Sequence, residues 1–147
     1  MLSKIKQLFS KKGEESDQDR VAKEHLATAA LLIEVMVIDG DLDEQELLSI
    51  SATLCRILDL SEDQVNELIA LSREEVAEAT SLYQFTREIN ANFDIDGKKE
   101  LLTSMWRVAY ADGQLDKHEE GIIRRVADLL HIRHNEYIRC KLDAKQS

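Results

Sequence analysis

Two stretches of this chain repeat each other. They read Asp39-Gly40-Asp41-Leu42-Asp43-Glu44-Gln45-Glu46 and, 73 residues later, Asp112-Gly113-Gln114-Leu115-Asp116-Lys117-His118-Glu119. In both copies an apolar helical stretch runs into Asp-Gly, and a Leu, an Asp and a Glu then recur at the same offsets. A shared composition does not produce this agreement, so we expect one small fold with two equivalent acidic corners.

The repeat extends on both sides of the acidic corners. Residues 34–38 match residues 107–111, and after a one-residue slip Leu54, Leu58 and Leu60 match Val126, Leu130 and Ile132. Each unit is a helix, an acidic turn, a second helix, a short turn and a third helix. We expect the two units to pack about a pseudo-twofold axis, with residues 73–91 as connecting helices.

The composition favours helices. The 147 residues suffice for one domain with its own core, and they include no proline, five glycines, 44% apolar residues and 33% charged residues. The predicted fold is all-α, a compact bundle of about seven or eight short helices with an internal pseudo-twofold repeat. Residues 1–16 form an arm and linker, and residues 17–147 form the helical domain.

A capping box marks the expected helix starts, because a Ser or Asp followed three residues later by Glu or Gln satisfies exposed backbone amides. The pairs are Ser61/Gln64, Ser72/Glu75, Ser81/Gln84, Asp43/Glu46 and Asp116/Glu119. Together with apolar periodicity they predict helices over residues 18–38, 43–58, 62–71, 73–79, 82–91, 97–111, 117–130 and 135–143.

The N-terminal arm is basic and amphipathic. Residues 1–12 carry four lysines and no acid, with Leu2, Ile5, Leu8 and Phe9 at helical spacing. Such a segment docks weakly to an anionic membrane surface when it docks at all. The two interpretations are a frayed tail and a weak membrane-surface contact through Met1 to Lys12.

The net charge of −10 excludes nucleic-acid phosphate as an expected partner and favours divalent cations or a basic protein surface. Cys55 and Cys140 are lone cysteines in helical patterns, typical of a reducing cytosol. The sequence has no signal peptide and no apolar run of the roughly 18 residues that span a bilayer. We therefore expect a cytoplasmic protein, membrane-peripheral if the arm docks.

Helix capping explains part of each acidic corner. Gly40 and Gly113 can end a helix in the left-handed conformation, while Asp43/Glu46 and Asp116/Glu119 can form the capping boxes of the next helices. A tight helix-turn-helix connection would select these residues without any ligand.

Capping leaves Asp39 and Asp112 unexplained. Each lies five residues, roughly 140° around the helix, from the charged residue Glu34 or Arg107 of the preceding turn, so it points toward the apolar side. A carboxylate in that environment needs amide donors or a cation. Each corner offers three carboxylates, the oxygen ligands that Ca²⁺ and Mg²⁺ prefer, so the candidate metal ligands are Asp39, Asp43, Glu46, Asp112, Asp116 and Glu119. Cation binding and capping alone both remain open.

Sharper motifs fail on spacing. An EF-hand loop starting at Asp39 would have its glycine at position 2 and Ile50 at position 12, and one starting at Asn92 would have Thr103 at position 12. The sequence from His118 to Ile122 lacks the second His of a zinc protease, and no phosphate loop or nucleophile arrangement occurs. The sequence predicts no catalytic residues, so an enzyme is not expected.

Two segments resemble the tellurite-resistance protein TerB family, whose signature is Ala-Asp-Gly followed by an acidic turn and a Glu. They are Val35-Met36-Val37-Ile38-Asp39-Gly40 and, more specifically, Met105-Trp106-Arg107-Val108-Ala109-Tyr110-Ala111-Asp112-Gly113-Gln114-Leu115-Asp116-Lys117-His118-Glu119. The resemblance implies an all-helical, internally symmetric bacterial domain with an acidic, metal-binding surface and no established catalytic activity. Asp39, Glu46, Asp112 and Glu119 match the family's acidic positions, whereas Ile38 stands where the family usually has alanine.

The expected function is therefore a non-enzymatic module that binds Ca²⁺ or Mg²⁺ at two acidic corners and serves in a stress or tellurite response. The alternative is a protein-interaction module whose carboxylates only cap helices and whose acidic face docks a basic protein surface, as in a co-chaperone. Melting the protein with EDTA and with divalent cations separates the two, because a ligand that binds only the native state raises the midpoint.

Overall fold

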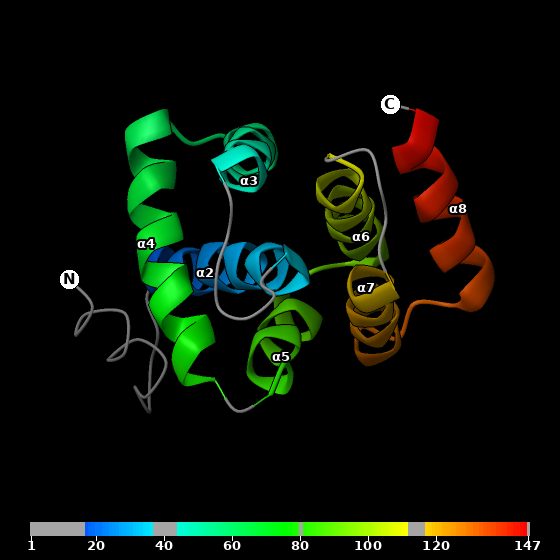
Figure 1. Ribbon diagram of the computed structural model, residues 1–147. Helices are drawn as coiled ribbons and strands as arrows, with labels where there is room; N and C mark the ends of the chain where they lie inside the picture. The colour runs from blue at the N-terminus through cyan, green and yellow to red at the C-terminus, as the bar shows by residue number, and fades with distance from the viewer. Residues whose placement is uncertain (1–16, 37–43, 80, 112–116, 147) are drawn as a thin grey trace.

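The computed structural model describes residues 17–36, 44–79, 81–111 and 117–146, and no strand occurs in these ranges (Figure 1). The helices are α2 (Asp17–Met36), α3 (Glu44–Leu58), α4 (Glu62–Glu78), α5 (Tyr83–Asn92), α6 (Ile95–Ala109), α7 (Lys117–Leu129) and α8 (His134–Gln146). The predicted all-α bundle is confirmed. The arm and linker predicted over residues 1–16 lie outside the described residues.

Helix α2 is the central helix of the bundle and in Figure 1 runs from α4 toward α6 and α7. From Leu26 to Met36 its residues are buried, apart from the half-buried Glu34. Helices α3 to α7 all pack against it. A helix that is apolar around its whole circumference belongs in a core. Among the described helices, none has the combination of length and apolar character that crossing a bilayer demands.

The helices pack with pseudo-twofold symmetry. Helix α2 packs against α3 and α4 as α6 packs against α7 and α8, and the contact between α3 and α6 matches that between α2 and α7. Two residues with positive φ mark equivalent turns, Asp59 after α3 (φ 54°) and His131 after α7 (φ 62°). Asp59 and His131 lie one residue closer together than the 73-residue repeat, which agrees with the one-residue slip between the two sequence repeats. The helix packing and the turns thus agree with the predicted repeat.

Helix α5 breaks this symmetry. It packs against α2 and α7 and buries Phe85, Thr86 and Ile89 there. Under the pseudo-twofold relation its counterpart would pack against α6 and α3. No described helix stands in that place.

One predicted capping box is confirmed, and those at Ser72 and Ser81 are wrong. The Ser61 hydroxyl accepts from the Gln64 amide at 3.2 Å, and the Gln64 side-chain oxygen accepts from the Ser61 amide at 2.9 Å. The predicted break at Ser72 does not occur, because α4 runs unbroken from Glu62 to Glu78. Ser72 is buried inside that helix, and its hydroxyl donates to the Leu68 carbonyl at 2.7 Å. A serine that bonds within its own helix does not cap another one.

The starts of α5 and α6 also differ from prediction. The N-cap of α5 is Leu82, with no side-chain cap bond, and the Ser81 hydroxyl accepts from the Tyr83 amide at 3.3 Å instead of forming a box with Gln84. Helix α6 begins two residues before the predicted start, at Ile95, because the Asp94 carboxylate accepts from the Gly97 amide at 2.8 Å.

An aromatic cluster joins α6 to α8. Trp106, the single tryptophan of the chain, is fully buried, with its ring centroid 6.1 Å from that of Tyr110 and 5.5 Å from that of Tyr137. The Lys141 amine lies 5.1 Å from the centre of the Trp106 ring. Such aromatic and cation contacts fix the orientation of the ring.

The cysteines are free thiols. Cys140 is buried, and its Sγ donates to the Lys99 carbonyl at 3.6 Å, while Cys55 is half-buried. Burial raises the pKa of the Cys140 thiol, which lowers its reactivity.

Candidate functional site

The two acidic corners connect equivalent helices. The first lies between the end of α2 at Met36 and the start of α3 at Glu44, and the second lies between the end of α6 at Ala109 and the start of α7 at Lys117. Four of the six candidate metal ligands, Asp39, Asp43, Asp112 and Asp116, fall outside the described residues. The other two, Glu46 and Glu119, are described.

Glu46 and Glu119 occupy corresponding places. Each lies in the first turn of its helix, and in each the Oε2 atom is enclosed by protein. Glu119 is only 3% exposed, although Lys117 and His118 beside it are exposed. Carboxylates seldom lie this deep without charged or amide partners, and helix N-termini offer both amides and a favourable dipole. Both repeats therefore turn a carboxylate inward at the same position.

The apolar faces that lead into the corners are buried as predicted. Val35 and Met36 end the buried face of α2, and Met105 and Val108 end that of α6. The prediction that Asp39 and Asp112 continue these faces concerns residues that are not described.

The segments that flank the two corners approach each other. The Gln45 side-chain amide, in the first turn of α3, donates at 3.3 Å to the carbonyl of Ala111, which follows the end of α6. Glu34 lies near the end of α2, before the first corner, and His118 lies at the start of α7, after the second. Burial raises the pKa of Glu34, and the positive charge of His118 partly opposes this effect. The first turn of α3 thus contacts the residues that follow α6, and the first turn of α7 lies close enough to α2 for His118 to affect the pKa of Glu34.

No group of three or more His, Cys, Asp or Glu side chains gathers within the described ranges. Each predicted ligand set includes two aspartates outside those ranges. Metal binding by the six carboxylates therefore stays a prediction.

A cleft with the opposite charge opens between α3 and α6. It has a volume of about 740 Å³, and its cationic lining residues are Arg56, Arg107 and Lys145. We did not predict it from the sequence, where the visible signal was that Arg107 replaces Glu34 at the corresponding position of the repeat.

In a comparison with protein-family models, residues 25–142 match the model described as Tellurite resistance protein TerB. The match covers most of the chain, including both corners. Comparisons with curated proteins and with solved structures give no significant match.

Proposed function

Because the chain belongs to the TerB family, we propose that it is a non-enzymatic cytoplasmic module that binds divalent cations at its two acidic corners and acts in a stress or tellurite response. The ligands would be Asp39, Asp43 and Glu46 in one corner and Asp112, Asp116 and Glu119 in the other.

The inward position of Glu46 and Glu119 carries this proposal. A carboxylate needed only for solubility would extend into water. In both of these glutamates, however, the protein buries one carboxylate oxygen at the first turn of a helix. The two aspartates of each corner lie three and seven residues before its glutamate, so all three carboxylates belong to one turn and the helix start that follows it.

An oxygen-only ligand set suits a hard cation. Three carboxylates with backbone carbonyls and water provide the six to eight oxygens that Ca²⁺ takes, or the octahedral set of Mg²⁺. The first corner is the stronger site on charge, because it also carries Asp41 and Glu44 where the second has Gln114 and Lys117.

Calorimetric titration with Ca²⁺ and Mg²⁺ tests the proposal. The informative variants are Glu46→Gln, Glu119→Gln, Asp43→Asn and Asp116→Asn, because glutamine still completes a capping box and asparagine is as good an N-cap as aspartate. They remove a charged ligand and keep the cap. We expect each to weaken binding at its own corner about tenfold or more, in line with the 1.5–3 kcal/mol of a charged contact.

The matched control is Glu62→Gln, an exposed glutamate in the first turn of α4, which should leave cation affinity unchanged. If the unmodified protein binds neither ion more tightly than about 1 mM, the weak end for oxygen-ligand sites, the carboxylates serve only as caps.

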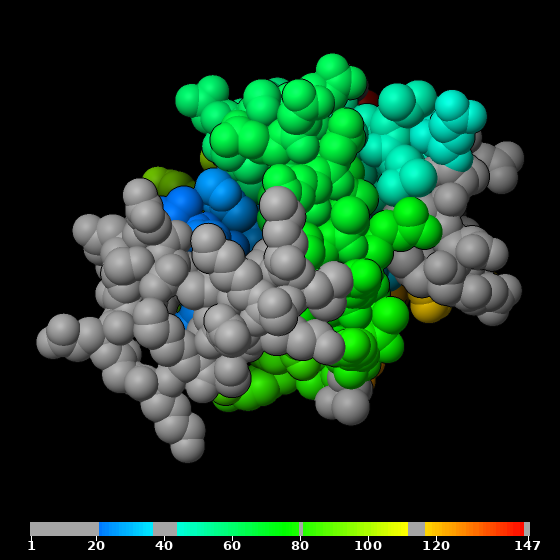
Figure 2. Space-filling view, turned by 90° about the vertical axis from the view of Figure 1, so that its left-hand side faces the viewer, coloured from blue at the N-terminus to red at the C-terminus, as the bar shows by residue number. Residues whose placement is uncertain are grey.

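The second candidate is the interaction module, and one observation favours it. Leu48 on α3 is 65% exposed and lines a groove of about 310 Å³ between α3 and α4, which lie side by side in Figure 2. Glu44, Glu62 and Arg73 line this groove, so its acidic side chains outnumber its basic one and a basic amphipathic segment of a partner would fit it. Melting midpoints that do not change with EDTA, Ca²⁺, Mg²⁺ or Zn²⁺ would favour this candidate over the first.

A further inference from the structure

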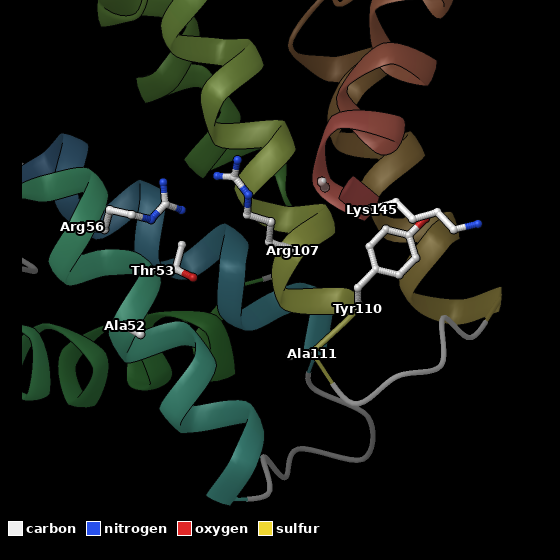
Figure 3. A pocket seen from close by; sticks show the side chains of 8 residues that line it. Ala52, Thr53, Arg56, Arg107, Tyr110, Ala111 and Lys145 are labelled. Atoms are coloured by element: carbon white, nitrogen blue, oxygen red, sulfur yellow. The ribbon is translucent and has the colours of Figure 1, made fainter. Parts of the chain in front are cut away.

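The cleft between α3 and α6 has a cationic lining. Arg56 on α3 and Arg107 on α6 direct their guanidinium groups into the same space, and Tyr110 extends from the end of α6 toward Lys145 on α8 (Figure 3). None of the described lining residues is acidic. In a chain with a net charge of −10, this is a local reversal of sign.

Helix dipoles explain only part of this arrangement. Arg56, Arg107 and Lys145 each lie in the last turn of their helices, where a cation is favoured. The dipole does not require α3 and α6 to turn Arg56 and Arg107 toward the same space, while the Lys145 amine points away from that space (Figure 3). Within the described part of the chain, Arg56 and Lys145 form no ion pair with an acidic side chain.

The pseudo-twofold relation supplies an internal comparison. The corresponding pocket lies between α2 and α7, has a volume of about 160 Å³, and is lined by Glu34 and Arg125. Glu34 is the counterpart of Arg107 in the repeat. The same helix packing therefore forms with an acid in place of the arginine, so the fold itself does not need a cationic lining.

The absence of an α5 counterpart keeps the cleft open. In the smaller pocket, Leu82 and Phe85 from the start of α5 fill the space beside α2 and α7. No described helix does this beside α6 and α3, where the cleft is more than four times larger. The space left open is thus the space into which Arg56 and Arg107 point (Figure 3).

The chemistry of the lining indicates the ligand. Guanidinium groups bind phosphate and carboxylate through paired N–H donors. The lining also includes the methyl groups of Ala52, Ala111 and Ala144 and the ring of Tyr110. We propose that this cleft binds a small organic anion, in which a phosphate or carboxylate group contacts Arg56 and Arg107 and an apolar or aromatic body packs against Tyr110.

Trp106 provides the readout. Its ring stacks on that of Tyr110 at 6.1 Å, so a ligand on Tyr110 should change the emission of the only tryptophan in the chain. We would titrate the full chain with phenyl phosphate at constant ionic strength and expect a saturable change with a dissociation constant on the order of a few millimolar or less. Inorganic phosphate and neutral phenol should each bind at least about tenfold more weakly, because each offers only half of the contacts.

The variants Arg56→Gln and Arg107→Gln should each weaken phenyl phosphate binding about tenfold or more, with unchanged circular dichroism. The matched control is Arg125→Gln, which removes a cation from the corresponding pocket and should change the affinity less than about twofold. Nuclear magnetic resonance shifts of the Thr53 and Ala111 amides should follow the fluorescence.

Several results would overturn the proposal. They are the absence of saturation, an equal effect of Arg125→Gln, and binding of phenol as tight as that of phenyl phosphate. If inorganic phosphate binds as tightly as phenyl phosphate, the cleft recognises the phosphate group alone, and the proposed contact of an organic body with Tyr110 is wrong. Tighter binding of hexaglutamate than of phenyl phosphate would assign the cleft to an acidic protein segment instead of a small molecule.

Discussion

Replacing His131 with glycine should stabilise the protein. His131 follows α7 with a φ of 62°, and its amide donates to the Asp128 carbonyl at 3.1 Å while the Ile132 amide donates to Ala127 at 2.9 Å. These two bonds form a Schellman motif, in which glycine is the favoured left-handed residue. His131 is exposed, so the substitution removes little packing.

The expected gain follows from two opposing terms. The left-handed conformation costs an L-residue about 1–2 kcal/mol, and glycine loses about 0.5–1 kcal/mol more backbone entropy than alanine on folding. The difference spans about 0–1.5 kcal/mol, and the middle of that range is a stabilisation of about 0.5–1 kcal/mol. For a protein of this size that corresponds to a rise in melting temperature of roughly 1–4 °C. Asp59→Gly, at the equivalent turn, should give a smaller gain because aspartate tolerates this conformation better.

Urea denaturation of His131→Gly, His131→Val and Glu74→Gly measures these differences. Valine should destabilise the turn, and glycine at the exposed position 74 inside α4 should cost about 1 kcal/mol. If His131→Gly destabilises the protein as much as Glu74→Gly does, the left-handed residue carries no strain and the reasoning is wrong.

Three further predictions concern capping, helix contact and pH. Ser61→Ala should lower the free energy of unfolding by about 1 kcal/mol because it removes a cap, whereas Ser72→Ala, inside α4, should change it by less than about 0.5 kcal/mol in chemical denaturation. Asn90→Ala should cost about 1 kcal/mol or more, because its side chain donates to the Leu129 carbonyl at 2.9 Å and ties α5 to the end of α7; an unchanged urea midpoint would contradict this. Burial raises the pKa of Glu34 above its usual 4.5, so the folded state favours the protonated carboxyl. The unmodified protein should therefore lose stability relative to Glu34→Gln as the pH rises through the folded pKa, and the two proteins should be equally stable below pH 4.5. Melting both proteins at several pH values measures this difference.

The sequence predicted the fold because local and long-range patterns agreed. Apolar periodicity located the helices, and the 73-residue repeat predicted that the same three-helix unit occurs twice. The structure places the matched residues Leu54 and Val126 in one core and gives Asp59 and His131 the same unusual backbone conformation. A pattern that recurs in two units is a stronger guide than either unit alone.

The errors arose where identical local patterns serve different roles. Ser61 and Ser72 both precede Glu or Gln by three residues, but only Ser61 lies at a helix start. Ser72 is buried under neighbouring helices, and its hydroxyl donates a hydrogen bond to the Leu68 carbonyl of its own helix. Tertiary packing, which a short sequence window does not contain, decides between these two outcomes.

The cationic cleft was partly visible in the sequence. The exchange of Glu34 for Arg107 between the repeats was readable, but the approach of Arg56 and Lys145 depends on how α3 and α8 pack beside α6. The acidic corners were the reverse case. Their six carboxylates were read directly from the sequence, and the structure describes Glu46 and Glu119 among them.

The central place of α2 has a consequence for synthesis on the ribosome. The helix is made before the other six described helices. Helices α6 and α7 cover part of its apolar surface, yet among the described helices only α8 is made after them. Helices α3 to α5 can shield only the rest of α2 while the chain grows at about 5–20 residues per second. A nascent chain that has not yet reached α6 therefore displays unburied leucine and isoleucine side chains, and a stall at that point should direct the protein to chaperones or to aggregation.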